Sequence, residues 1–219
     1  MKKSANPGFY PVLVNLERFP CLIIGGGKVA YRKVLSLQEF NAKITIISPK
    51  ICKPLLELAK KNKISVIKKY YSTEILKDYK IIFSATDNPD VNKKIRNDCT
   101  KAGILLNVAD NPPLCDFILP ANIRRGDLTV SVSSQGKAPF YTKEMKKKID
   151  SFISPVYSEI MDLAGKFRKQ LLNRNRAISA NIKTKMFRKF TSVNWEEILT
   201  ENGEKSSGYY IKKILRGFN

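Results

Sequence analysis

The chain of 219 residues contains no histidine, and no two of its four cysteines form a Cys-x-x-Cys pair. The usual zinc sites therefore cannot be assembled, and such widely spaced thiols do not suggest a disulfide framework. Apolar runs fall far short of the ~18 residues that a membrane-spanning helix needs. No apolar signal-type stretch follows the basic residues at the N-terminus. We expect a cytoplasmic protein with no metal cofactor and no membrane contact.

Acidic residues are also few, since 19 Asp and Glu stand against 40 Lys and Arg, giving a net charge of +21. Residues 163–190 contain nine basic side chains and no acidic one. Such a stretch can attract a polyanion, either a nucleic acid or a small polycarboxylate. Because the remaining positive charge is spread along the chain, a nucleic-acid arm is not favoured. A solvated helix face in a lysine-rich protein stays open as the alternative.

A glycine turn near the N-terminus joins two segments of different character. The apolar run Cys21–Ile24 is typical of a parallel strand buried on both faces, and the residues after the turn have helical spacing. With Ala30 the turn forms Gly-x-Gly-x-x-Ala, a pattern that holds a dinucleotide pyrophosphate at a helix N-terminus. A glycine turn can also be only a tight connection. The predicted cofactor contacts here are Gly25, Gly26, Gly27, Lys28 and Val29.

Short apolar runs alternate with helical segments through the first half of the chain. This alternation predicts an α/β fold, a doubly wound parallel sheet of the Rossmann type. Pro89 and Gly103 agree with the usual start and stop preferences of a helix. The predicted strands are residues 12–14, 21–24, 44–47, 64–67, 81–84 and 104–108, and the predicted helices are residues 28–40, 50–62, 73–78 and 89–102.

The pattern changes after Asn107, where an asparagine and two prolines at 111–113 break the chain. Residues 117–119 and 128–132 have strand character, and the sequence is helical from about Thr142 onward. Helices are predicted over about 151–172 and 176–190, followed by a weaker tail punctuated by asparagine, glycine and serine. We expect a second, smaller unit in this half.

Ligands of a doubly wound sheet lie beyond the carboxyl ends of its strands, so the loops there are candidate sites. Where an NAD-binding fold often has an acidic residue, the second strand is followed by Ser48, Pro49 and Lys50, which leaves NAD versus NADP open. Thr86 and Asp87 follow a later strand, and they could contact a cofactor or simply cap the next helix. Further cofactor contacts are predicted at Asn107 and Val108.

Five loop motifs, taken in order, resemble the precorrin-2 dehydrogenase and sirohydrochlorin ferrochelatase family of siroheme biosynthesis. The resemblance covers about residues 8–150. It rests on GGGKVAYRK (25–33), ATDN (85–88), NVADNP (107–112), CDFILPA (115–121) and SSQGKAP (133–139). It implies NAD-dependent dehydrogenation of precorrin-2 to sirohydrochlorin, and in many relatives insertion of ferrous iron to give siroheme.

The resemblance also implies roles for individual residues. Asp110 matches the catalytic aspartate, and a carboxylate in this loop could accept the proton that dehydrogenation releases. Asp116 is the rival carboxylate, although the apolar residues after it suggest the entrance of a strand. Residues implied for binding the carboxylates of the tetrapyrrole are Ser134, Gln135, Lys137 and Arg124, with Arg125 a further candidate; a solvated turn is the alternative for both arginines.

Family members form dimers, so the resemblance implies a homodimer and a division into three parts. These are an NAD-binding Rossmann domain at 1–113, a small α+β dimerisation region at 114–150 and a helical basic region at 151–219.

Two other classes of function remain open. One is a regulatory module that senses NAD without catalysis, which would need neither Asp110 nor the polyanion site of residues 133–137. The other is a nucleic-acid-binding protein built on residues 163–190, which would bind DNA with a steep dependence on salt.

Overall fold

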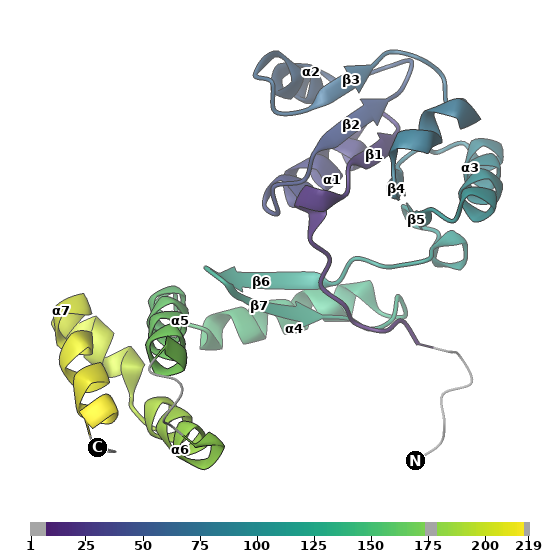
Figure 1. Ribbon diagram of the computed structural model, residues 1–219. Helices are drawn as coiled ribbons and strands as arrows, with labels where there is room; N and C mark the ends of the chain where they lie inside the picture. The colour runs from purple at the N-terminus through teal and green to yellow at the C-terminus, as the bar shows by residue number, and fades with distance from the viewer. Residues whose placement is uncertain (1–7, 174–178, 217–219) are drawn as a thin grey trace. The chain divides into compact units, whose positions relative to one another are not determined.

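The computed structural model describes residues 8–173 and 179–216, which divide into two compact units after Leu119. The first unit holds a parallel sheet with helices, and the second holds a hairpin and four helices (Figure 1). Among the described residues, no helix combines the length and the apolar character needed to span a bilayer.

The sheet of the first unit has five parallel strands in the order β3-β2-β1-β4-β5. The chain first winds outward from β1 through β2 to β3 and then returns to the other side of β1 with β4 and β5. The order therefore reverses between β1 and β4, which confirms the predicted doubly wound sheet. The strands are β1 (Cys21–Ile24), β2 (Ile44–Ile47), β3 (Ser65–Ile67), β4 (Ile81–Ser84) and β5 (Leu105–Val108).

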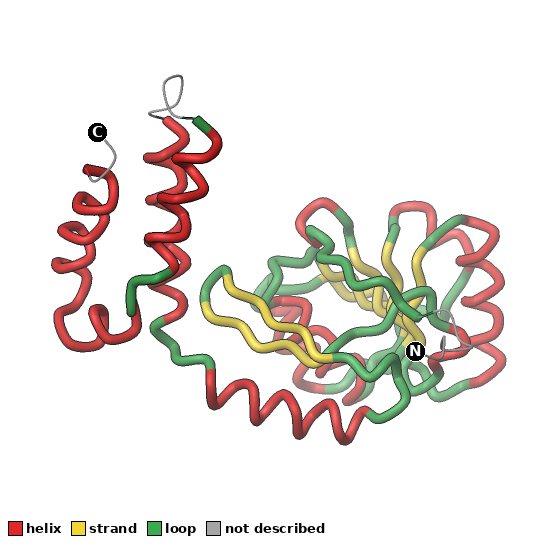
Figure 2. Tube along the Cα trace, turned by 90° about the horizontal axis from the view of Figure 1, so that it is seen from below, coloured by secondary structure: helices red, strands yellow, loops and turns green. Residues whose placement is uncertain are grey.

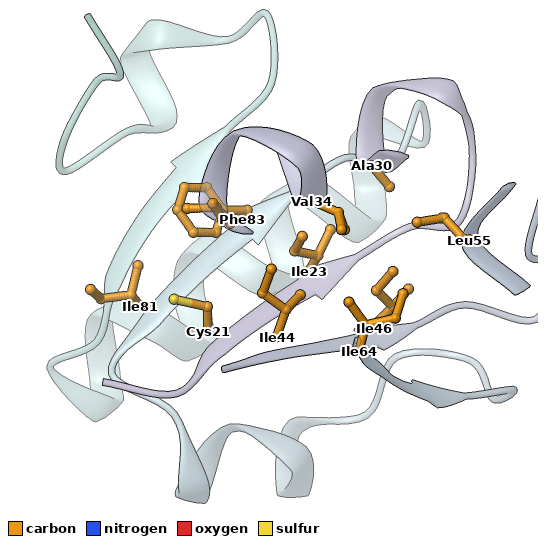
Figure 3. Close-up of a cluster of buried hydrophobic side chains, with 11 residues drawn as sticks. Cys21, Ile23, Ala30, Val34, Ile44, Ile46, Leu55, Ile64, Ile81 and Phe83 are labelled. Atoms are coloured by element: carbon orange, nitrogen blue, oxygen red, sulfur yellow. The ribbon is translucent and has the colours of Figure 1, made fainter. Parts of the chain in front are cut away.

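Helices cover both faces of this sheet, which explains why its strands are continuously apolar. On one face, Cys21 and Ile23 pack with Phe83 beneath helices α1 (Lys28–Gln38) and α2 (Lys53–Lys60), as Figure 3 shows. On the other face, Leu22 and Ile24 pack with helix α3 (Pro89–Ala102) and the 3-10 helix η2 (Thr73–Asp78). Two more 3-10 turns are η1 (Leu16–Arg18) and η3 (Pro112–Leu114).

The second unit begins with an antiparallel hairpin of β6 (Ala121–Arg125) and β7 (Leu128–Val132). Helix α4 (Pro139–Phe152) runs alongside the hairpin, which is drawn as the two-stranded yellow tube next to this helix in Figure 2. Helices α5 (Tyr157–Asn173), α6 (Ala180–Thr191) and α7 (Trp195–Arg216) form a bundle. Its core stacks Phe190 on Phe167, with 4.8 Å between ring centroids, and Trp195 donates from Nε1 to the Phe190 carbonyl.

Several predicted elements are wrong. Residues 12–14 form no strand, and the side chains of Val12 and Leu13 are 64% and 86% exposed. Residues 117–119 form no strand either, because Asp116 occupies the outer edge of β5: its N–H donates to the Leu106 carbonyl and its Oδ2 accepts from the Leu106 N–H.

The helical half also differs in detail from its prediction. The expected helix 151–172 is two helices, interrupted before Tyr157 where Pro155 disfavours helical geometry in the residue before it. Helix α4 begins at Pro139, earlier than expected, and the weak tail is one long helix, α7. Strand β6 was not anticipated. The predicted helix 176–190 partly falls outside the described residues, and α6 covers the part that is described.

Candidate functional site

The glycine turn after β1 is shaped by close contacts of its backbone. Gly25 has φ +122°, and a Cβ there would collide with the Ala85 carbonyl at the end of β4. A Cβ on Gly26 would collide with the Lys50 carbonyl in the loop after β2. The turn is therefore wedged between the two neighbouring loops, and only glycine fits at these positions.

Gly27, by contrast, borders open space. It is the N-cap residue of α1, no side chain caps this helix, and a Cβ built on it would have no atom within 4 Å. The first turn of α1 thus begins beside open space at the carboxyl edge of the sheet, where the helix dipole favours an anion. A pyrophosphate fits this arrangement. Lys28 is exposed beside it, and Val29 is half-buried.

The loop after β2 lies against the glycine turn, because the Cys52 N–H donates to the Gly26 carbonyl at 2.8 Å. Ser48 is half-buried, and Pro49 and Lys50 are exposed. Lys50 is the one ionisable residue of these three, and its side chain is a cation. The structure brings together this loop, the glycine turn and the loop after β4, as the sequence predicts for a dinucleotide site.

The loop after β4 is held by side chains that sequence reasoning missed. The buried Ser84 hydroxyl donates to Asn92 Oδ1 at 2.6 Å, and Asn92 Nδ2 donates to the Thr86 carbonyl. Asn88, not Thr86 or Asp87, caps α3, since its Oδ1 accepts from two N–H groups of the first turn. The helix-cap alternative for the latter two residues is therefore wrong: Thr86 is half-buried and Asp87 exposed at the sheet edge.

Asp110 lies in the turn that follows β5. Its φ of +56° is in the left-handed region, which asparagine and aspartate tolerate better than most residues, and the residue is exposed. The turn begins where the Ala109 N–H donates to the Ser84 carbonyl at the end of β4. The carboxylate therefore lies at the same edge of the sheet as the glycine turn.

The residues before Asp110 are part of the framework. Asn107 is only 6% exposed; its Oδ1 accepts from Lys33 Nζ at 3.0 Å and its Nδ2 donates to the Phe117 carbonyl at 3.0 Å. Val108 is buried, and its N–H contacts Cys115 Sγ. The side chain of Asn107 is thus engaged within the fold. Lys33 is a functional candidate to which sequence reasoning gave no role, although it is the last residue of the GGGKVAYRK motif.

Asp116 has different surroundings from Asp110. Its Oδ1 forms an ion pair with Arg96 at 2.8 Å, and its Oδ2 accepts from the Leu106 N–H. A carboxylate held by a guanidinium and a backbone donor serves the framework and is poorly placed to accept protons from a ligand. The geometry thus supports the preference for Asp110.

The predicted tetrapyrrole-binding residues lie in the second unit. Ser134 is half-buried, and its Oγ accepts from the Ala138 N–H at the start of α4. Gln135, with φ +57°, and Lys137 are exposed in the same turn. Ser134 therefore shapes the turn that presents its two neighbours to solvent.

The two arginines lie on strand β6, so the prediction of a solvated turn is wrong for both. Arg124 is exposed, and its Nε donates to the Gly126 carbonyl at 3.1 Å. Arg125 is half-buried, pairs with Asp150 at 2.9 Å and donates to the Ile153 carbonyl. Of the two, Arg124 is the more exposed, and Arg125 ties the hairpin to α4.

Three of the four thiols are shielded by burial. Burial raises the pKa of Cys21 and of Cys99 to about 11, so both are neutral at physiological pH. Burial also raises the pKa of Cys115. In the described part of the chain, no three His, Cys, Asp or Glu side chains lie close enough together to hold a metal ion.

Comparison with known proteins agrees with a dinucleotide-binding fold. Residues 12–121 match the model of a family described as putative NAD(P)-binding. The siroheme synthase of Vesicomyosocius okutanii is 31% identical over 95% of this chain and 41% of its own length. That of Ruthia magnifica is 34% identical over 74% of this chain and 34% of its own. The chain thus spans well under half of these relatives.

A solved structure shows the same fold along nearly the whole chain. SirC, a precorrin-2 dehydrogenase, superimposes with a TM-score of 0.70 over 95% of this chain and 100% of its own, at 24% sequence identity. The family match and the glycine turn together establish a nicotinamide dinucleotide as the cofactor. The chain belongs to the putative NAD(P)-binding family whose model it matches, and it is similar to siroheme synthases and, in fold, to a precorrin-2 dehydrogenase.

Proposed function

We propose that this protein oxidises precorrin-2 to sirohydrochlorin with NAD as the hydride acceptor. The observation that carries the proposal is Asp110, an exposed carboxylate on a left-handed turn at the same sheet edge as the uncapped N-terminus of α1. The similar proteins, a siroheme synthase and a precorrin-2 dehydrogenase, suggest the substrate class.

The proposed chemistry divides between cofactor and protein. Bound NAD supplies an acceptor for the hydride that leaves the partly reduced macrocycle. Asp110 takes the proton released when the new double bond forms, so that two hydrogens leave as a hydride and a proton. The N–H groups at the start of α1, beside Gly27, hold the pyrophosphate. Ser48, Pro49 and Lys50 flank the position of the ribose that the fold predicts.

The substrate is a polycarboxylate, for which exposed cations and polar groups are suitable partners. We assign this contact to the exposed Arg124 on β6 and to Gln135 and Lys137, whose turn is shaped by Ser134. The net charge of +21 favours association with such a molecule. Nucleic acid is not required to explain the charge.

Three finer features belong to the same proposal. Ferrous iron insertion into sirohydrochlorin would use the same carboxylate to accept pyrrolic protons, the final metal ligands being the nitrogens of the macrocycle. Residues 114–150 would form the contact between the two subunits of a homodimer. In sequence they follow the Rossmann domain of residues 1–113 and precede the helical region of residues 151–219. The cytoplasm would be the place of action.

An anaerobic assay tests the proposal. Purified protein is mixed with precorrin-2 and NAD, and the NADH absorbance and the sirohydrochlorin spectrum are followed together. Appearance of both in equal amounts is expected. Absence of both, with NAD still binding, would contradict the enzyme and favour a module that senses NAD without catalysis. Ferrous iron is then added to the product to test chelation.

A further inference from the structure

A half-buried ammonium group lies beneath the loop that carries Asp110. Lys33 belongs to α1, and its Nζ donates to Asn107 Oδ1 on β5 at 3.0 Å. The same Nζ lies 5.4 Å from the centroid of the Phe83 ring on β4, within the range of a cation–π contact. Figure 3 shows Phe83 beneath α1 on this face of the sheet. Lys33 thus joins helix α1, which begins at the glycine turn, to strands β4 and β5.

The contact continues through Asn107 to the other end of the loop. Asn107 Nδ2 donates to the Phe117 carbonyl, and the Phe117 ring packs edge-on against Phe83 with 5.5 Å between centroids. Asn107 precedes Asp110 and Phe117 follows it. The hydrogen bonds from Lys33 to Asn107 and from Asn107 to Phe117 therefore hold the two ends of the loop together. Asp110 lies between these two ends.

Packing alone does not account for a lysine at this position. An ammonium loses hydration when it is buried, and an apolar side chain next to the buried Ala30 and Val34 would avoid that cost. Burial lowers the pKa of Lys33, and the positive charge of Arg32 lowers it further, whereas Cys115 and Asp110 raise it. The charges that act on this ammonium thus include the carboxylate of the proposed base.

We propose that Lys33 is a positioning residue, which fixes the turn of Asp110 relative to helix α1 through its contacts with Asn107 and Phe83. The role rests on the proposed dehydrogenase function. In this role, Lys33 keeps the distance between the cofactor site and Asp110 constant. Its own side chain touches neither the substrate nor the reacting atoms.

Steady-state kinetics test the positioning. In Lys33→Met we expect kcat to fall by about 10- to 100-fold, the loss typical of a small misplacement of a catalytic group, with little change in KM for NAD. Arg32→Met, which removes a charge from the exposed side of the same helix, is the control and should keep kcat within about twofold of the wild type. Equal kcat values for Lys33→Met and wild type would overturn the proposal.

The pH profile separates charge from bulk. Because burial lowers the pKa of Lys33, its ammonium loses its proton at lower pH than a free lysine, and wild-type kcat should decline on the alkaline side. Lys33→Arg keeps its charge, so its decline should move to higher pH. An alkaline limb that is the same in Lys33→Arg and wild type would contradict the charged role, even if Lys33→Met does not fold.

Hydrogen–deuterium exchange of the cofactor-free protein gives a readout independent of activity. Amides of residues 107–117 should exchange faster in Lys33→Met than in wild type and in Arg32→Met. Unchanged exchange would overturn the proposal regardless of turnover. A wild type without dehydrogenase activity, combined with faster exchange in Lys33→Met, would instead refute the proposed function and leave Lys33 as the residue that orders this loop.

Discussion

Two carboxylates occupy the loop after β5, and the atoms around each give it a different task. Asp116 is tied to Arg96 and to the Leu106 N–H, whereas Asp110 is exposed on a left-handed turn. An aspartate with its oxygens already bonded contributes to folding, and an exposed one remains available to a ligand. Substitutions at the two positions should therefore affect different measurements.

Asp110→Asn should reduce dehydrogenation by about 100- to 10,000-fold, because the amide keeps the shape of the side chain but cannot accept the proton. Binding of NADH, measured by fluorescence, should be unchanged. Asp90→Asn, an exposed position in the first turn of α3, serves as the control. Near-normal turnover in Asp110→Asn would move the base elsewhere.

Asp116→Ala should lower the free energy of unfolding by about 1–3 kcal/mol, since it removes the acceptor of the Leu106 N–H and the ion pair of Arg96. Urea unfolding followed by circular dichroism measures this loss. An unfolding midpoint equal to that of the wild type would show that solvent replaces both contacts.

At the residue scale, the sequence predicts what depends on local backbone chemistry. Gly25 and Gly26 could be identified because a strand, a glycine turn and a helix follow one another directly. Lys33 and Asn92 could not be identified, because they lie on helices and their partners, Asn107 and Ser84, lie on strands. Nothing in a linear pattern pairs these residues. Which residues gather at the site depends on tertiary packing.

Single elements show the same division. Helix α3 begins and ends as predicted because Pro89 and Gly103 act locally, with Gly103 in the left-handed region at φ +63°. The apolar stretches 12–14 and 117–119 look like strands but find no partner strand, and strand formation requires one. Strand β6 escaped prediction because its arginines suggested a turn.

Asn88→Ala should destabilise the protein by about 1 kcal/mol, because the Asn88 side chain accepts from two N–H groups at the start of α3. Thermal unfolding at neutral pH measures the change. Asp87→Ala removes a neighbouring side chain that does not cap the helix, and it should leave the midpoint nearly unchanged. Equal losses in both variants would indicate that the loop as a whole, and not the cap, is responsible.

At the scale of the whole molecule, the second unit presents large apolar side chains to solvent. Phe140, Tyr141 and Phe152 of α4 are all strongly exposed, although aromatic side chains contribute heavily to interfaces when they are buried. Such a surface is typical of a contact between subunits. It supports, independently of the resemblance, the proposed homodimer.

Size-exclusion chromatography with light scattering should therefore give the mass of a dimer at micromolar concentration. The double variant Phe140→Glu, Phe152→Glu places charges on this surface and should shift the protein toward the monomer. A monomeric wild type would contradict the proposed quaternary structure, and a variant that stays dimeric would place the interface on other residues.

The ion-paired Asp116 also covers part of an outer strand of the sheet, because β5 has a partner on one side only in the part of the chain that the structure describes. An outer strand with free N–H and C=O groups is a template on which a further chain can add, and long open edges of this kind lead to aggregation. Asp116 binds both backbone groups of Leu106 on β5: its N–H donates to the Leu106 carbonyl, and its carboxylate accepts from the Leu106 N–H. One residue thus terminates the ladder at this position, and removing its carboxylate would leave the Leu106 N–H of an outer strand open to a further chain.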